Sequence, residues 1–230
     1  MVKLLHAADL HLDSAFSALP PEKAAQRRAE QRLVLERLTA LSEGCAAVLL
    51  AGDLFDSARV YRDTLEALRA ALAACRCPVF IAPGNHDALL PGSPYLENGW
   101  PENVHIFRTA EPERVSLPEF DVYGAGFLRA EMPAMLDGFR VADPARLNIL
   151  VLHGDAENPA SPYDPVSSAA LAAFLNFYLR NMFENVRLVG STSTSEMFEQ
   201  LLRVGKEDVV IGISLPRYSS RTVKLLQYAH

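Results

Sequence analysis

Four short apolar runs in this sequence each end in a cluster of Asp, Asn or His residues. Each run is too short for a helix, which is typical of a buried strand. Ligand sites of open α/β sheets lie at the carboxyl ends of the strands. The pattern therefore predicts an α/β fold with a metal centre at one edge of a sheet. The runs cover residues 3–8, 46–50, 78–83 and 148–152, and they lead into Asp9-Leu10-His11, Gly52-Asp53-Leu54-Phe55-Asp56, Gly84-Asn85-His86-Asp87 and His153-Gly154-Asp155.

The segments between these runs predict helices and a second sheet. Helical spacing of apolar residues predicts helices over residues 22–43 and 61–74. Residues 104–107, 114–117 and 120–123 are β-like and predict a second, mainly antiparallel sheet. The apolar residues at helical spacing are Leu33, Val34, Leu38 and Leu41 in the first helix and Leu65, Leu68, Ala71 and Leu72 in the second.

The composition fits a soluble globular protein. Half of the 230 residues are apolar and 22% are charged, which is ordinary for this class. No apolar run approaches the roughly 18 residues of a membrane span. Residues 1–3 lead directly into a strand and not into a signal peptide, so we expect a cytoplasmic protein without membrane association. Cys45, Cys75 and Cys77 cannot form a disulfide framework or complete a zinc site, and we expect them to be small buried residues.

The net charge of −6 is unevenly distributed. Residues 1–166 contain 15 Lys and Arg against 23 Asp and Glu, whereas residues 167–230 contain 7 against 5. An acidic first part argues against a broad, non-specific nucleic-acid surface. It does not exclude phosphodiester substrates, because bound divalent metal ions would reverse the local sign of the charge.

The four polar clusters contain the donors that a two-metal hydrolytic site requires. Such a site holds two ions about 3.5–4 Å apart around a shared ligand, a role that suits the carboxylate of Asp53. Asp9 and His11 are the candidate ligands of one ion, and Asn85 and His153 are those of the other. Mixed imidazole, carboxylate and amide donors suit Mn²⁺, Fe²⁺ or Zn²⁺ better than Mg²⁺ or Ca²⁺.

The same clusters offer residues for the chemistry of phosphoester hydrolysis. A hydroxide held between two ions would attack phosphorus in line. His86 is the candidate to stabilise the transition state or to protonate the leaving oxygen. Asp56 would orient that imidazole by accepting its other N–H. Each motif alone is also typical of a simple turn, but four of them in order after apolar strands favour the metal site. We expect no catalytic role for His6 and His105.

With these motifs, residues 1–166 resemble the calcineurin-like metallophosphoesterases and, among them, the SbcD-like DNA repair exonucleases. The likeness rests on the four motifs, the first extending over residues 6–14, and on residues 161–165. It implies a two-sheet sandwich flanked by helices, manganese at two sites, and exonuclease or endonuclease activity on DNA. It also implies an SMC-like ATPase partner and a homodimer. The family has a further Gly-His-x-His motif that completes both metal shells, but the only later histidine here is His230.

The remainder of the chain resembles a different family. Residues 169–230 are similar to part of a sugar isomerase (SIS) domain of RpiR-type transcriptional regulators, on residues 171–180, 185–189 and 208–222. The resemblance implies a partial αβα segment that binds a sugar phosphate through a Ser/Thr loop. Hydroxyl donors at a helix N-terminus form an anion site, although they can equally serve as helix caps. The candidates are Ser214, Ser219, Ser220 and Thr222.

The sequence thus predicts two domains, a C-terminally incomplete phosphoesterase at residues 1–166 and a partial SIS-like segment at residues 167–230. Our first interpretation is a metal-dependent phosphodiesterase or DNA exonuclease with an activity impaired by the missing ligands. One alternative is a phosphosugar-binding regulatory module with a vestigial metal site. Another is a fusion of two incomplete domains without a function of its own. A natural fusion, a gene rearrangement and an assembly artefact would all produce such a junction.

Overall fold

The computed structural model of the chain describes residues 2–156, 158, 160–166, 171, 175, 180 and 186–188. The chain divides into two compact units, Met1–Gly154 with Pro162–Asp164 and Asp155–Ser161 with Pro165–His230. The elements described below all belong to the first unit. The domain boundary at residue 166 stays a prediction. Within the described residues, no helix combines the length and the apolar character that crossing a membrane would require.

The first sheet has four parallel strands in the order β1-β2-β3-β4. Its first three strands confirm three of the apolar runs. The pattern assigns residues 104–107 to the second sheet, and this prediction is wrong, because β4 pairs in parallel with β3. About 20 residues connect these two strands, which is enough for a parallel crossover. The strands are β1 (Leu4–Ala7), β2 (Ala47–Ala51), β3 (Val79–Ala82) and β4 (Val104–Ile106), and a short 3₁₀ helix, η1 (Pro94–Leu96), lies in the crossover.

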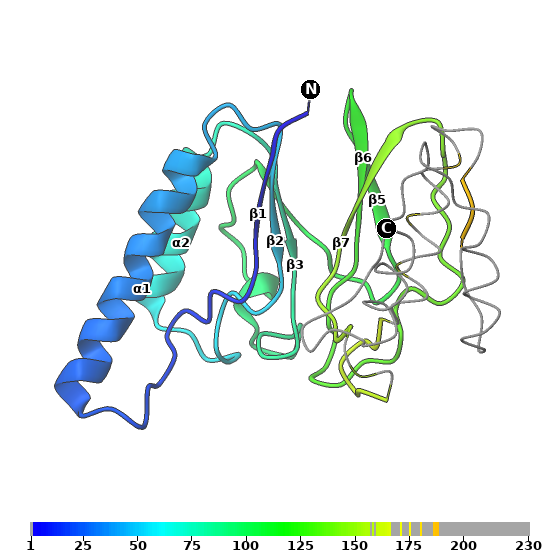
Figure 1. Ribbon diagram of the computed structural model, residues 1–230. Helices are drawn as coiled ribbons and strands as arrows, with labels where there is room; N and C mark the ends of the chain where they lie inside the picture. Colours follow the sequence, from blue (N-terminus) through cyan, green and yellow to red (C-terminus); the bar gives the residue numbers. More distant parts are fainter. Residues whose placement is uncertain are drawn as a thin grey trace, which may run out of the picture. The chain divides into compact units, whose positions relative to one another are not determined.

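The second sheet has the order β5-β6-β7 and is mixed. Its strands are β5 (Glu113–Ser116), β6 (Phe120–Gly124) and β7 (Leu147–Val151). The pair β5–β6 is antiparallel, as expected, but β6–β7 is parallel. β7 is the fourth apolar run, so the four polar clusters do not share one edge of a single sheet, which corrects the prediction. They meet because the two sheets pack face to face with the carboxyl ends of β1, β2, β3 and β7 at the same end (Figure 1).

Helices α1 (Pro21–Leu41) and α2 (Arg62–Ala74) cover the outer face of the first sheet (Figure 1). In α2 the predicted apolar face is confirmed by the burial of Leu65, Leu68 and Leu72. In α1 the predicted face is confirmed only at Leu38, because Leu33 and Leu41 are 55% and 61% exposed whereas Leu35, which the pattern did not include, is buried. The helix is highly charged and carries apolar residues on more than one side. Only the side with Leu35 and Leu38 faces α2 and the sheet, and the sequence pattern alone does not select it.

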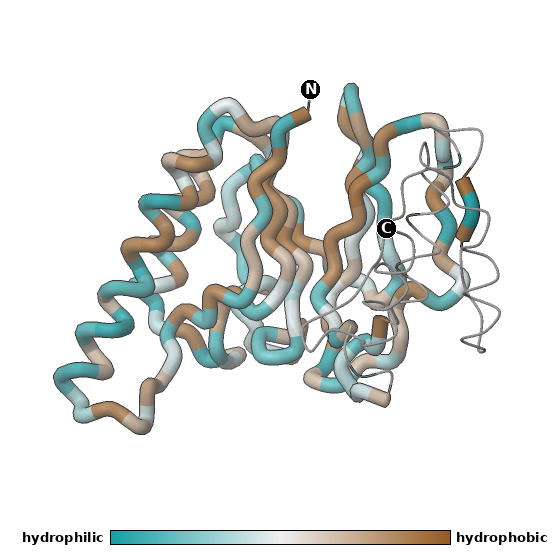
Figure 2. Tube along the Cα trace, in the orientation of Figure 1, coloured by the Kyte–Doolittle hydropathy of each residue, from teal (hydrophilic) through white to brown (hydrophobic). Residues whose placement is uncertain are grey.

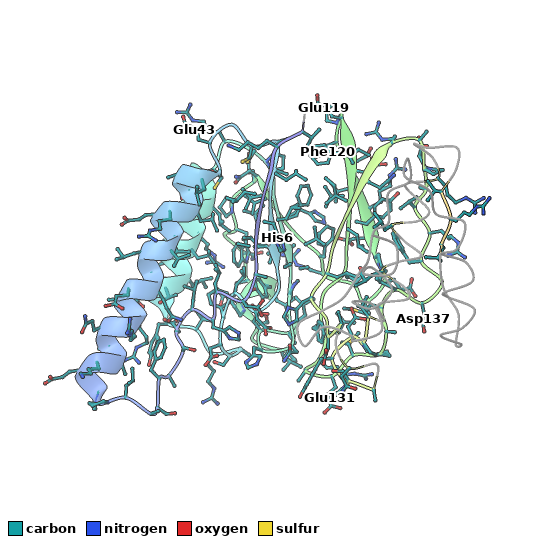
Figure 3. The ribbon with its side chains drawn as sticks, viewed as in Figure 1. His6, Glu43, Glu119, Phe120, Glu131 and Asp137 are labelled. Atoms are coloured by element: carbon teal, nitrogen blue, oxygen red, sulfur yellow. The ribbon has the colours of Figure 1, made fainter. Side chains whose placement is uncertain are left out.

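Strand β2 lies at the centre of the fold and is buried on both faces. Successive side chains of a strand point to opposite sides. Leu50 therefore packs with Leu68 beneath the helices, whereas Leu49 packs with Phe80 and Phe107 between the sheets. Figure 2 shows hydrophobic residues concentrated along these strands, and Figure 3 shows side chains filling the space between the sheets. The fold is thus a mixed α/β sandwich of two sheets with helices on the first.

Candidate metal centre

The loops after β1 and β2 continue the parallel pairing of their strands beyond the strand ends. Four backbone hydrogen bonds join them, and the last two belong to the short bridge between Leu12 and Phe55. These bonds hold the two acidic loops side by side at the end of the sheet. They run from Asp9 N–H to the Gly52 carbonyl (3.1 Å), from His11 N–H to the Asp53 carbonyl (2.9 Å), from Leu12 N–H to the Leu54 carbonyl (2.8 Å) and from Asp56 N–H to the Leu12 carbonyl (3.1 Å).

Three candidate ligands in these loops have a left-handed backbone. The φ angles are 53° at Asp9, 44° at His11 and 51° at Asp53. This conformation costs about 1–2 kcal/mol for a residue with a Cβ atom, although Asp and His tolerate it better than most residues. Strained residues of this kind cluster at functional sites, where the surrounding structure enforces them. Here the residues with the strained backbone are ones that the sequence assigns to metal binding.

Asp53, Asn85 and His153 converge on one point from three different strand ends. Asp53 is only 4% exposed, and its Oδ1 accepts a hydrogen bond from the backbone N–H of His86 at 3.0 Å. The His153 Nε2 atom lies 3.3 Å from Asp53 Oδ2 and 3.0 Å from Asn85 Oδ1. The other ring nitrogen, Nδ1, lies 3.3 Å from the carbonyl oxygen of Ala51. Oxygen atoms therefore face both nitrogens of this imidazole.

The charges of Asp53 and His153 support each other. Burial alone would raise the pKa of Asp53, but the hydrogen bond and charge of His153, with the N–H of His86, lower that pKa below its usual value. Burial alone would lower the pKa of His153, but the hydrogen bond and charge of Asp53 raise it. Each of the two side chains therefore favours the charged form of the other.

His11, Asp56 and His86 form a second cluster beside the first. The His11 Nδ1 atom lies 3.0 Å from Asp56 Oδ1, and its Nε2 faces Asp53 Oδ2 at 4.0 Å. The His86 Nδ1 atom lies 3.2 Å from the main-chain carbonyl oxygen of Asp56 and 4.0 Å from its carboxylate. The two rings meet edge to face, with centroids 5.0 Å apart. The carboxylate of Asp56 is thus nearer to His11 than to His86, the residue that the sequence assigned to it.

The structure brings together the seven residues predicted for metal binding and catalysis, but it groups them differently from the sequence-based assignment. The donor atoms of Asp9, Asp53 and His153 lie within 4.8 Å of one another, and so do those of His11, Asp56 and His86. Asp9 thus groups with His153 and not with His11. The individual roles of these residues stay predictions. Ser214, Ser219, Ser220 and Thr222 lie outside the described residues, and their proposed contact with a sugar phosphate stays a prediction as well.

The donors at the first cluster fit a divalent metal ion. If the Nδ1–H of His153 donates to the Ala51 carbonyl, the lone pair of Nε2 faces the oxygens of Asp53 and Asn85. These three electron-rich atoms repel one another unless a proton or a cation lies among them. Metal-ligating histidines commonly donate their other ring N–H to a carbonyl or carboxylate. His153 with Ala51 and His11 with Asp56 both follow this arrangement.

Sequence reasoning gave no role to two residues that border the site. Asp87 belongs to the third motif, but its side chain is fully buried and is directed away from solvent. Its carboxylate accepts a hydrogen bond from the hydroxyl of Tyr95, which is also fully buried. The position of Asp87 within the third motif was a signal in the sequence that could have pointed to it. Nothing in the sequence pointed to Tyr95, because its contact with the motif arises only when the chain turns back at η1.

Comparison with known proteins agrees with this fold. A model of the family described as calcineurin-like phosphoesterase matches residues 2–212. The chain is 35% identical to a protein of Bacillus subtilis (strain 168) named uncharacterized metallophosphoesterase YhaO, and the match covers 70% of this chain. It covers 43% of that relative, so the chain spans less than half of the relative's length. The family match also extends past residue 166, into the segment that the sequence assigned to an SIS-like domain.

The chain belongs to the calcineurin-like phosphoesterase family. Calcineurin-like phosphoesterases are a class of hydrolases that use divalent metal ions. This requirement agrees with the two donor clusters at the ends of the strands.

Proposed function

We propose that this chain is a manganese-dependent phosphodiesterase that acts on DNA as an exonuclease of the SbcD-like type. The observation that carries the metal-dependent chemistry is the position of the His153 Nε2 atom, which faces the oxygens of Asp53 and Asn85 at 3.3 and 3.0 Å. Manganese fits the mixture of carboxylate, imidazole and amide donors. The preference for DNA rests on the resemblance of residues 1–166 to that branch of the family.

The side chains divide the work of the proposed reaction. Asp9, Asp53 and His153 would hold one ion, with His11 and Asn85 available from the adjoining loops. Bound divalent ions would supply positive charge to the phosphoryl oxygens and activate water for attack. The His86 Nδ1–H donates to the main-chain carbonyl of Asp56. If the ring is the doubly protonated imidazolium, its Nε2–H would deliver a proton to the leaving oxygen and leave the neutral imidazole. The His86 side chain is 45% exposed, so a substrate can reach it.

Partners follow from the same resemblance. We propose that the chain acts with an SMC-like ATPase and with a second copy of itself, as the SbcD-like branch implies. Residues 1–166 are acidic overall, so DNA would be held through the metal ions and local contacts and not through a broad basic surface. The two family histidines are not present in the sequence before His230. Because these two ligands are missing, we expect a weak affinity for the metal ions.

The test is hydrolysis of a chromogenic phosphodiester and of linear DNA by the purified chain. Reactions contain millimolar Mn²⁺ or EDTA, and a His86→Ala variant prepared in the same way controls for contaminating nucleases. The expected result is activity that requires Mn²⁺ and is lost in the variant. Equal activity in both proteins would contradict the proposal. So would no activity in a protein that is folded and saturated with Mn²⁺.

A second measurement reports metal binding without turnover. Mn²⁺ is expected to raise the melting temperature of the wild-type chain. The Asp53→Ala variant should lose this shift, because Asp53 contacts both His153 and the backbone of His86. A shift that persists in the variant would place the metal elsewhere on the chain.

A further inference from the structure

A buried carboxylate links two of the loops that carry the candidate site. Asp87 Oδ1 accepts a hydrogen bond from the backbone N–H of Gly84 at 2.8 Å, within its own loop. Asp87 Oδ2 accepts one from the backbone N–H of Phe55 at 3.1 Å, in the loop that follows β2. The same Oδ2 accepts a third from the hydroxyl of Tyr95 at 2.5 Å. A fully buried carboxylate needs such partners, because an unpaired one would be strongly destabilising.

The two linked loops carry different parts of the candidate site. Phe55 lies two residues after Asp53, and Gly84 directly precedes Asn85. One further bond joins the loops on the site side, from the His86 N–H to Asp53 Oδ1 at 3.0 Å. Asp87 therefore helps to fix the distance between Asp53 and the Asn85–His86 pair, through hydrogen bonds to the backbone of both loops. A small rotation of its side chain would alter that spacing.

Tyr95 fixes the orientation of Asp87. Its ring stacks on Trp100, with centroids 5.7 Å apart and planes inclined by 24°, and it packs against Phe55. Its carbonyl oxygen accepts a hydrogen bond from Arg108 at 3.0 Å. Burial and the negative charge of Asp87 raise the pKa of Tyr95 well above its usual value, so the hydroxyl keeps its proton. Tyr95 is thus a rigid, neutral donor with one partner.

We propose that Tyr95 and Asp87 are positioning residues for the candidate metal centre. The hydroxyl of Tyr95 holds the Asp87 carboxylate, and that carboxylate fixes the loop of Asp53 against the loop of Asn85 and His86. This inference rests on the proposed function and deepens it, because it assigns the preorganisation of the ligands to two residues that touch neither metal nor substrate.

The test compares two Tyr→Phe variants of the full chain. Tyr95→Phe removes the hydroxyl and keeps the ring, so the core stays filled. Tyr123→Phe is the matched control, because Tyr123 is 3% exposed and its hydroxyl accepts a hydrogen bond from the N–H of Ala142 at 2.8 Å in the second sheet. Each substitution removes one buried hydrogen bond and is expected to lower the melting temperature by about 2–4 °C. Only Tyr95→Phe should weaken Mn²⁺ binding, by roughly tenfold in isothermal titration.

A readout without metal separates this inference from the proposed function. In the metal-free protein, Tyr95→Phe should shift the imidazole resonances of His86 and His11 and speed amide exchange at Phe55 and Gly84, whereas Tyr123→Phe should leave them unchanged. Equal resonances and equal Mn²⁺ affinity in the two variants would overturn the positioning role and leave Tyr95 a structural residue. If the wild-type chain binds no Mn²⁺, the proposed function fails. The metal-free resonances then decide the positioning role alone.

Discussion

The Nδ1 atom of His11 lies 3.0 Å from the Oδ1 atom of Asp56, although 45 residues separate them in the chain. This contact selects the imidazole form in which Nδ1 carries the hydrogen, so that the lone pair of Nε2 faces Asp53 at 4.0 Å. A hydrogen bond to a carboxylate also makes an imidazole a better metal ligand. Asp56 therefore orients the imidazole of His11 as well as contacting His86.

The first prediction concerns Asp56→Asn. The amide can turn its NH₂ group toward His11 Nδ1, which would place the hydrogen on Nε2 and block metal binding there. Mn²⁺ affinity should fall roughly 10-fold or more, as is usual when a ligand loses its supporting hydrogen bond. The measurement is isothermal titration. Asp63→Asn is the control, since this carboxylate is 65% exposed and pairs with Arg32 on the helix surface. Equal affinities in the two variants would contradict the role of Asp56.

The second prediction concerns Gly52, which has a φ angle of +78° directly before Asp53. A Cβ atom at this position would collide with the side chain of His153. Gly52→Ala should therefore displace His153 and abolish the stabilisation by Mn²⁺. Gly44→Ala is the control, because Gly44 has a similar φ of +70° but open space around it. The control should cost only about 1 kcal/mol and keep its Mn²⁺ response. A normal response in Gly52→Ala would argue against the placement of His153.

The third prediction concerns pH and the buried Asp121 of β6. Burial alone would raise the pKa of Asp121, but hydrogen bonds from Ser116 and Arg114 and the charges of Arg114 and Arg146 lower it below the usual value. A lowered pKa in the folded state stabilises the protein above the unfolded pKa, which is about 3.9. This stability is lost as the pH falls through the folded pKa.

Asp121→Asn should accordingly lower the urea midpoint at pH 7. The difference from the wild type should begin to shrink below about pH 4, where the carboxyl group of the unfolded chain is protonated, and should disappear as the pH falls through the lowered folded-state pKa of Asp121. The measurement is urea unfolding at several pH values. Glu119→Gln, which changes an exposed acid in the turn directly before β6 (Figure 3), should show little effect at any pH. A difference between Asp121→Asn and the wild type that stays constant with pH would contradict the assignment.

The fourth prediction tests which side of α1 is buried. Leu35 is 3% exposed and Leu41 is 61% exposed. Leu35→Ala should cost about 2–5 kcal/mol of the free energy of unfolding, through lost contacts and a cavity. Leu41→Ala should stay within about 0.5 kcal/mol, as for other surface substitutions. Urea unfolding of both variants measures the difference. Equal losses would mean that the helix presents its other apolar side to the core.

Local sequence determined the strands, the helices and the identity of the polar clusters. Short apolar runs, such as the one that becomes β2, are too short to form a stable helix, so they are predicted as strands. Clusters of Asp, Asn and His residues directly after several such runs indicate a functional site, because the fold itself does not require these residue types there. The sequence alone therefore predicted a set of candidate metal ligands, namely Asp9, His11, Asp53, Asn85 and His153.

Only the tertiary structure decided how these parts combine. The assignment of β4 and β7 to their sheets depends on pairing between distant segments, which short-range periodicity does not encode. The buried side of α1 depends on what packs against it. The contact of Asp56 with His11 and the link from Tyr95 through Asp87 to Phe55 depend on how the loops face one another. Such contacts join residues far apart in the chain, so their geometry follows from packing and not from local sequence.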